Sequence, residues 1–123
     1  MVRNDTEGRC GVIKLKLSSR TVLLFNLYLP CCDGSSEYKT NLCFYAGFIT
    51  DVLESVDHTD CVIMGDFNFE CDVSKCGYVI FKPLLDQFDL IAGDNYLPIS
   101  NRHTYVNEAL RNASCIDHFF YLE

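Results

Sequence analysis

The sequence has no stretch that approaches the ~18 uninterrupted apolar residues of a membrane-spanning helix. Its first residues, Met1 to Glu7, are mostly polar or charged and contain no apolar signal region. We therefore expect an intracellular protein, nuclear or cytoplasmic, that makes no contact with membranes.

Proline is also scarce, with three residues, and charged residues make up only 22% of the chain. Both values argue against disorder. Hydrophobic residues make up 49%, and nine Phe and seven Tyr supply large side chains for a core. At 123 residues the chain is long enough for one domain at most.

Basic residues are few, and the formal net charge is −7. Residues 1–20 hold five basic and two acidic residues, a charge of +3, so the remainder carries −10. This balance counts against a generic nucleic-acid binder, because neutralising phosphates takes Lys and Arg. A metal-dependent phosphodiesterase can still have an acidic centre, since the cation offsets the phosphate charge.

Cysteine is abundant, with eight residues, but no Cys-x-x-Cys and no Cys/His spacing typical of a zinc site is present. We assign no metal ligands from this pattern. Without a signal region, free thiols are the expected state. Cys71 and Cys76 flank a predicted turn and could touch, although nothing in the sequence requires a bond between them.

Hydrophobic periodicity predicts a mixed α/β domain in the order β-β-α-β-α-β-β. Residues 1–10 are expected to be frayed, and residues 11–17 and 21–29 to form a hairpin. A helix capped by Ser36 is expected over 37–56, and a second over 79–88 with Pro83 in its first turn. The other expected segments are strands over 61–64, 89–93, 104–106 and 114–122, and loops over 69–78 and 94–103.

The most informative segment is the apolar run Cys61–Met64, which reads as a buried strand and leads into Gly65, Asp66, Phe67 and Asn68. If the chain stays extended, Asp66 and Asn68 point to the same side and form a catalytic edge. The alternative is a plain turn, because Asp and Asn bond to their own backbone and Gly tolerates a positive φ.

The segment Val62 to Asn68 resembles the Gly-Asp-Phe-Asn signature of the endonuclease/exonuclease/phosphatase superfamily, which includes DNase I and abasic-site endonucleases. Two more segments agree in order and spacing, namely Asn26 to Pro30 and Thr104-Tyr105 followed by Cys115 to Phe120. Retrotransposon endonucleases of the LINE type are the most similar in character. The resemblance spans nearly all of residues 1–123, but only a middle part of the family domain. It implies an α/β (α+β) fold, part of a DNase I-like four-layer sandwich with mixed, mostly antiparallel sheets and flanking helices.

The resemblance further implies hydrolysis of a phosphoester, with Mg²⁺ as cofactor and DNA as ancestral substrate. Asp66 would orient or deprotonate the attacking water, and Asn68 would bind the phosphate. Tyr28 would contact the phosphate or support the leaving group, and Thr104 would be a secondary contact for the substrate. Asp117 would orient a catalytic histidine. Tyr28 could instead simply end a strand, and Thr104 could be an ordinary strand residue.

Two departures from the family pattern bear on activity. His118 neighbours Asp117 on a strand, so the two side chains face opposite ways. The family's metal-binding Glu and its late Ser-Asp-His segment have no counterpart in this sequence. We therefore expect weak Mg²⁺ binding and little activity from this chain alone. A phosphatase is one alternative. The other is a non-catalytic retroelement remnant or interaction module, able to self-associate through exposed sheet edges.

Overall fold

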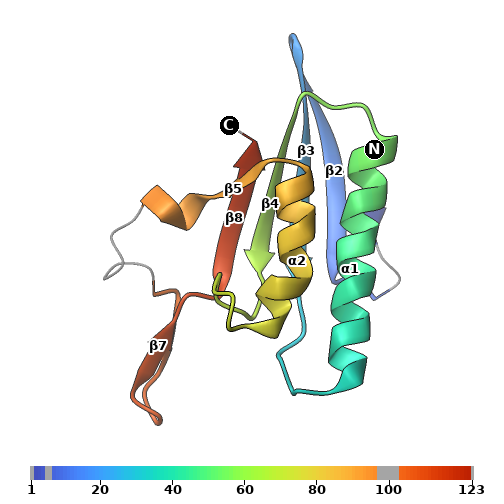
Figure 1. Cartoon of the computed structure of the whole chain (residues 1–123). Helices are drawn as coiled ribbons and strands as arrows, with labels where there is room; N and C mark the ends of the chain where they lie inside the picture. The colour runs from blue at the N-terminus through green and yellow to red at the C-terminus, as the bar shows by residue number, and fades with distance from the viewer. Residues whose placement is uncertain (1, 5–6, 97–102, 123) are drawn as a thin grey trace.

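A six-stranded sheet carries two helices on one of its faces in the computed structural model, which describes residues 2–4, 7–96 and 103–122 (Figure 1). The strand order is β1-β2-β3-β4-β8-β5. These strands are β1 (Val2–Asn4), β2 (Cys10–Leu17), β3 (Arg20–Tyr28), β4 (Asp60–Asp66), β5 (Leu90–Ala92) and β8 (Asp117–Leu122). The helices are α1 (Ser36–Ser55) and α2 (Cys76–Gln87), with the short 3₁₀ helix η1 (Gly93–Tyr96) after β5.

The strand directions confirm the predicted fold class. β2 and β3 form the expected hairpin, and α1 then carries the chain across to β4, which runs parallel to β3. The pairs β1–β2, β4–β8 and β5–β8 are antiparallel, so the sheet is mixed and mostly antiparallel. A separate hairpin of β6 (Tyr105–Asn107) and β7 (Asn112–Ser114) extends away from the body of the domain (Figure 1).

The core lies between the sheet and the helices. Alternate residues of the central strands face α1 and α2 and are buried, as period-2 patterning requires. The fully buried large side chains are Phe25, Phe67, Phe81, Phe120, Leu23, Leu27, Leu29, Leu42, Ile49, Ile63, Val12 and Val52. The apolar stripe of α1 faces the sheet, because Tyr38, Leu42, Tyr45, Ile49, Val52 and Leu53 are all buried.

The opposite face of the sheet, which we call the open face, is apolar and has no helix over it among the described residues. The exposed large hydrophobic side chains on this face include Leu15 and Met64, each 38% exposed, Phe119 at 49% and Leu17 at 55%. Part of a sandwich of two sheets would expose such an apolar face. At one end of it Arg20 forms a two-pronged ion pair with Asp60.

The first helix begins one residue earlier than predicted. Its N-cap is Ser35, whose hydroxyl accepts the Tyr38 N–H at 3.0 Å, whereas the sequence pointed to Ser36. Asp33 fixes this arrangement, because its carboxylate accepts bonds from both the backbone and the hydroxyl of Ser35. Two adjacent serines are equivalent in a sequence pattern, and only the turn before them decides which one caps the helix.

The second helix is longer than predicted, and the expected placement of Pro83 in its first turn is wrong. The helix begins at Cys76, so Pro83 lies in its interior and gives it no backbone donor. The ring is on the exposed side, while Phe81, Leu84 and Leu85 are buried against the core. Burial of this apolar stripe compensates for the missing hydrogen bond.

Two other boundaries differ from the prediction. Within the expected frayed residues 1–10, Val2–Asn4 form β1, and Cys10 opens β2 and is buried. The pairing uses backbone groups, which a polar sequence does not reveal. The expected final strand over 114–122 is split, because β7 pairs with β6 and only β8 joins the main sheet. Residues 97–102 of the expected 94–103 loop lie outside the described residues. None of the described helices is both long and apolar enough to cross a membrane.

Candidate active site

Three of the predicted site residues lie side by side across the sheet. The β3–β4 register pairs Tyr28 with Asp66, and the β4–β8 register pairs Asp66 with Asp117. Residues paired in register point to the same face, and here that is the open face. The three side chains, which we call the carboxylate row, therefore lie about 5 Å apart on neighbouring strands.

Gly65 allows β4 to deliver Asp66 to this row. Its φ of +137° lies in a region that is essentially reserved for glycine. A Cβ at this position would lie 2.0 Å from the carbonyl oxygen of Leu27, on the paired strand β3. The positive φ that glycine tolerates is therefore used here, and the close neighbour is the backbone of β3.

Asn68 does not continue the extended path that the sequence analysis considered. It has a φ of +53°, and its N–H donates to Oδ1 of Asp66 at 2.9 Å, which closes an Asx-turn. Its side-chain Nδ2 donates to the carbonyl of Leu29 at 2.7 Å and so ties the turn to the end of β3. The turn alternative therefore describes the local conformation, and Asp66 is both a member of the turn and a member of the row.

Phe67, between these two polar residues, anchors the turn in the core. It is fully buried and makes edge contacts with Phe69, Phe81 and Phe120 at ring-centroid distances of 5.3 to 6.0 Å. Its N–H donates to the carbonyl of Ile116 at 2.8 Å. The buried ring thus holds the backbone of the Asp66 turn against β8 and limits its freedom to move.

Thr104 acts on the backbone at Asp117. Its Oγ1 accepts the N–H groups of Ile116 and Asp117 at 3.0 and 3.1 Å, and its own N–H donates to the carbonyl of Ser114. These bonds hold the start of β8 and connect it to the β6–β7 hairpin. The structure therefore gives Thr104 a positioning role at the row, and its predicted contact with substrate stays a prediction.

Tyr28 is an exposed member of the row, with 58% of its surface accessible. The guanidinium of Arg9 lies over its ring, 5.0 Å from the centroid, and also donates to the Tyr28 carbonyl at 3.1 Å. The backbone N–H of Tyr28 donates to the carbonyl of Arg9 at 2.8 Å. The basic N-terminal region, noted in the sequence for its charge, thus places one cation beside the row.

Part of the row opens onto a shallow depression of about 590 Å³ on the open face. Asp66 and Asp117 line it together with the apolar Val62, Met64 and Phe119 and the amide of Asn26. Asn68 instead lines a different depression, with Phe69, Lys75 and Cys76 around the start of α2. The structure therefore brings Asp66, Asp117 and Tyr28 together and places the side chain of Asn68 apart from them.

Neither a protein-family model nor a curated protein matches the sequence. Solved structures do match. An AP endonuclease from Archaeoglobus fulgidus superposes with a TM-score of 0.71 at 14% identity, covering 98% of this chain and 57% of that one. The 3′ phosphatase NExo (D146N) from Neisseria, bound to a product DNA hairpin, gives a TM-score of 0.70 at 16% identity and coverages of 95% and 53%. The mannosyl-6-phosphatase Bt3783 of Bacteroides thetaiotaomicron gives 0.58 at 19% identity, with coverages of 91% and 42%.

This chain has the DNase I-like fold. It spans between about two fifths and three fifths of the length of these neighbours. The open face and the one-sided helical layer are what part of such a sandwich presents. At these identities the likeness shows the fold, and the chemistry must be argued from the residues of the carboxylate row.

The two carboxylates of the carboxylate row suit a hard divalent cation. Asp66 and Asp117 are directly opposite on antiparallel strands, where like charges repel. Neither forms an ion pair with a residue that the structure describes. Mg²⁺ prefers oxygen ligands and is held by one or two carboxylates plus waters and phosphate. The donor set therefore fits such an ion.

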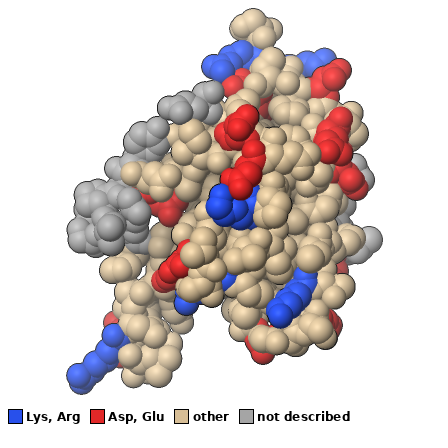
Figure 2. Space-filling view, viewed as in Figure 1, with Lys and Arg blue, Asp and Glu red and all other residues tan. Residues whose placement is uncertain are grey.

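The helical side of the fold carries acidic and basic side chains without a basic patch. Figure 2 views this side and shows scattered acidic side chains with isolated basic ones between them. The overall charge of −7 agrees with this picture.

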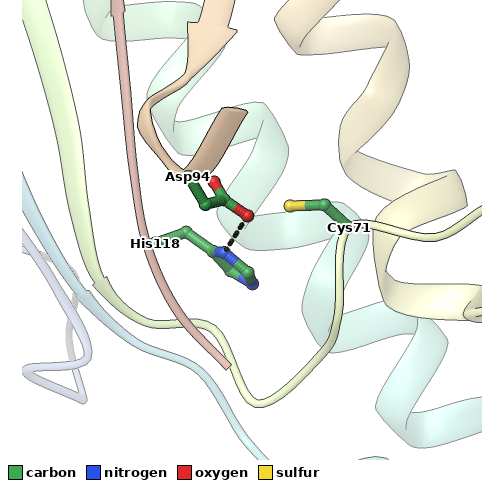
Figure 3. A group of neighbouring side chains, drawn as sticks. All are labelled: Cys71, Asp94 and His118. Atoms are coloured by element: carbon green, nitrogen blue, oxygen red, sulfur yellow. Dashed lines mark ion pairs between the residues drawn. The ribbon is translucent and has the colours of Figure 1, made fainter. Parts of the chain in front are cut away.

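A second group of polar side chains, on the helical side of the sheet, was not predicted. Ligand atoms of Cys71, Asp94 and His118 lie within 4.8 Å of one another (Figure 3). The three residues come from a loop, from η1 and from β8, and they are more than 20 positions apart, so no local spacing marks them. Burial, followed by the nearby Asp94 and Cys115, raises the pKa of the Cys71 thiol to about 12. As predicted, His118 faces away from Asp117, since it is buried while Asp117 is exposed.

Proposed function

We propose that this chain carries the carboxylate edge of a metal-dependent phosphodiester hydrolase that acts on nucleic acid. The observation that carries the proposal is the alignment of Tyr28, Asp66 and Asp117 in one row on the open face. The neighbours of the same fold include an AP endonuclease and a phosphatase bound to a DNA hairpin. The LINE-like character of the motifs also favours DNA as the substrate.

Asp66 and Asp117 would hold the divalent cation, which supplies positive charge to the phosphate and the leaving oxygen when bound. Asp66 Oδ1 already accepts the Asn68 N–H. Oδ1 keeps one lone pair that could contribute to holding the cation, and Oδ2 is left to orient the attacking water and accept its proton. The exposed Tyr28 hydroxyl would reach the phosphate or the leaving oxygen from the neighbouring strand. Thr104 would keep Asp117 in place through its two backbone bonds.

A plasmid-nicking assay with Mg²⁺ tests this function, with Asp66→Asn as the variant and Asp86→Asn as the matched control. Asp86 is an exposed carboxylate on α2, paired with Lys82 and remote from the row. We expect slow nicking that stops with EDTA and falls by about 10²-fold or more in Asp66→Asn. The control should match the wild type. Equal nicking by wild type and Asp66→Asn would reject the assignment.

Metal binding can be tested without catalysis. Mn²⁺ is a paramagnetic stand-in for Mg²⁺, and its binding broadens the NMR signals of nearby residues. We expect broadening centred on the amides of Asp66 and Asp117, and loss of this pattern in Asp66→Asn. Broadening at the row without nicking would retain the cation site and remove the catalytic role from this chain.

A phosphatase is the second enzymatic candidate. One neighbour is a 3′ phosphatase and another a mannosyl-6-phosphatase. Running the same variants on a 3′-phosphorylated DNA hairpin and on a sugar phosphate separates the cases. Release of phosphate without nicking, again dependent on Asp66, would favour the phosphatase.

A non-catalytic interaction module is favoured by the open face itself. Ile13, Leu15, Leu17, Met64 and Phe119 expose apolar surface on one side of the sheet. The sheet edges β1 and β5 are only three residues long each, so they offer little to edge-to-edge pairing. Self-association through the edges stays a prediction, which sedimentation velocity over a range of concentrations would test.

A further inference from the structure

A second group of side chains, on the helical side of the sheet, offers sulfur and imidazole ligands, which the carboxylate row lacks. His118 is on the helical side of β8, and its side chain is 1% exposed. Cys71 lies on the loop that follows the Asp66 turn, and Asp94 lies in η1. Cys115 precedes β8, and its Sγ is 3.9 Å from Nδ1 of His118. Figure 3 shows Cys71, Asp94 and His118 converging from three separate segments.

The hydrogen bonds of His118 determine which ring nitrogen is available to a ligand. Nε2 is 2.7 Å from the carbonyl oxygen of Phe69. A carbonyl can only accept, so Nε2 carries the proton. In the neutral ring Nδ1 then presents its lone pair, and it faces Oδ2 of Asp94 at 3.5 Å. Two acceptors that face each other in a buried site call for a cation between them.

The distances favour a metal ion over a shared proton. A charge-assisted N–H···O bond is about 2.7–2.9 Å long, shorter than the 3.5 Å separation found here. With metal–nitrogen and metal–oxygen bonds of about 2.0 Å, tetrahedral ligand atoms lie about 3.3 Å apart. The other carboxylate oxygen, Oδ1 of Asp94, is buried and has no hydrogen-bond partner among the described residues. A buried carboxylate oxygen without a partner is an independent indication that the Asp94 carboxylate binds a cation.

We propose that Cys71, Asp94, His118 and Cys115 form a structural site for a zinc-type divalent cation. Cys71, Asp94 and His118 have their ligand atoms within 4.8 Å of one another. Cys115, whose Sγ is 3.9 Å from Nδ1 of His118, lies beside this group and would turn its sulfur inward to complete a tetrahedral set of protein ligands, as in structural zinc sites. The Phe69 carbonyl orients the imidazole from outside the coordination sphere. Thiolate ligands select against Mg²⁺, so this site is chemically distinct from the carboxylate row.

Such a site would link three segments that are far apart in the sequence. It would connect the loop after the Asp66 turn, η1 and the start of β8. Phe69 is two residues before Cys71 and packs on Phe67 of the turn at a ring-centroid distance of 5.5 Å. Cation loading would therefore stiffen the backbone that presents Asp66 and Asp117.

Binding of Co²⁺ to the reduced full chain tests the proposal, because tetrahedral Co²⁺ gives visible ligand-field bands and its thiolates give a near-ultraviolet charge-transfer band. We expect one equivalent to bind and Zn²⁺ to displace it. Asp94→Asn, Cys71→Ser and Cys115→Ser should each weaken binding more than about tenfold. The control Cys43→Ser, on the exposed side of α1, should leave the spectrum unchanged. Asp94→Asn preserves the shape of the side chain, so it keeps the test valid if the cysteine variants misfold.

Three outcomes would overturn the proposal. The first is a reduced and folded wild-type chain that takes up neither Co²⁺ nor Zn²⁺. The second is a cobalt spectrum that survives Asp94→Asn and Cys71→Ser but is lost in a Cys31→Ser, Cys32→Ser variant, which would mean an adventitious ion only. The third is a Cys71–Cys115 disulfide in freshly purified protein that binds no zinc after reduction. As an independent readout, Zn²⁺ should raise the thermal midpoint of the wild type and not that of Asp94→Asn.

Discussion

Replacing Gly65 of β4 by alanine should destabilise the fold far more than the same change at Gly47 of α1. The new Cβ would lie 2.0 Å from the carbonyl oxygen of Leu27 and 2.8 Å from its nitrogen. Both are backbone atoms of β3, so no side-chain rotation relieves the contact. The φ of +137° adds strain of about 1–3 kcal/mol for any residue with a Cβ.

The loss in the free energy of unfolding has two contributions, the backbone strain and the weakened hydrogen bonds between β3 and β4. Separating β3 from β4 at this point weakens one or two ladder hydrogen bonds, each worth about 0.5–1.5 kcal/mol net. Together with the strain, the loss is about 2–6 kcal/mol. A chain of 123 residues has a free energy of unfolding of about 6–18 kcal/mol. Gly65→Ala therefore removes a large share of the total and displaces Asp66 from the row.

Gly47→Ala is the matched control, because it makes the same chemical change on an exposed part of α1 where a Cβ meets no atom within 4 Å. Removing glycine from a helix interior should raise the free energy of unfolding by about 0.5–1 kcal/mol. Urea unfolding followed by circular dichroism measures both variants. With a slope of about 2 kcal/mol/M, a loss of 4 kcal/mol lowers the midpoint by about 2 M. A Gly65→Ala midpoint equal to that of the wild type would refute the close packing of β3 on β4.

Three more measurements test other parts of the structure. Ser35→Ala should lower the free energy of unfolding by about 1 kcal/mol and Ser36→Ala by less than half of that, and equal losses would show that the cap is misplaced. Phe67→Ala should cost about 3–5 kcal/mol in the same urea assay, because the ring is fully buried among aromatics, and a loss below 1 kcal/mol would contradict that packing. Burial raises the pKa of Cys61 from 9.0 to about 11, so the folded chain keeps a proton that the unfolded chain releases, and this stabilisation is lost as the pH rises from 9 through 11. Cys61→Ala should show a shallower alkaline decline in stability than the wild type, and identical slopes would refute the contribution.

The fold was predictable from the sequence where the signal is local and repetitive. The alternation in 11–17 and 21–29 and the helical spacing in 37–56 match β2, β3 and α1 within about two residues. Boundaries failed where the deciding partner is distant. Cys76 begins α2 because Phe81, Leu84 and Leu85 bury against the core, and β7 separates from β8 because β6 is its partner.

The candidate site was predictable in its residues but not in its arrangement. The motif around Gly65 pointed to Asp66, and the later Ile-Asp-His segment pointed to Asp117. Their alignment with Tyr28 depends on the registers of β3, β4 and β8, which no local pattern encodes. The conformation of Asn68 likewise depends on the Leu29 carbonyl that its side chain reaches.

The order of the elements, the apolar faces and the acidic residues at the strand ends can be read from the chain, because each follows from short-range periodicity or from a contiguous motif. Which of these residues meet depends on the pairing of the strands. Cys71, Asp94 and His118 come together because β8 inserts between β4 and β5 and turns its buried side toward the loop and η1. Contacts between residues more than 20 positions apart depend on how the whole sheet is paired, and this pairing is a property of the folded chain.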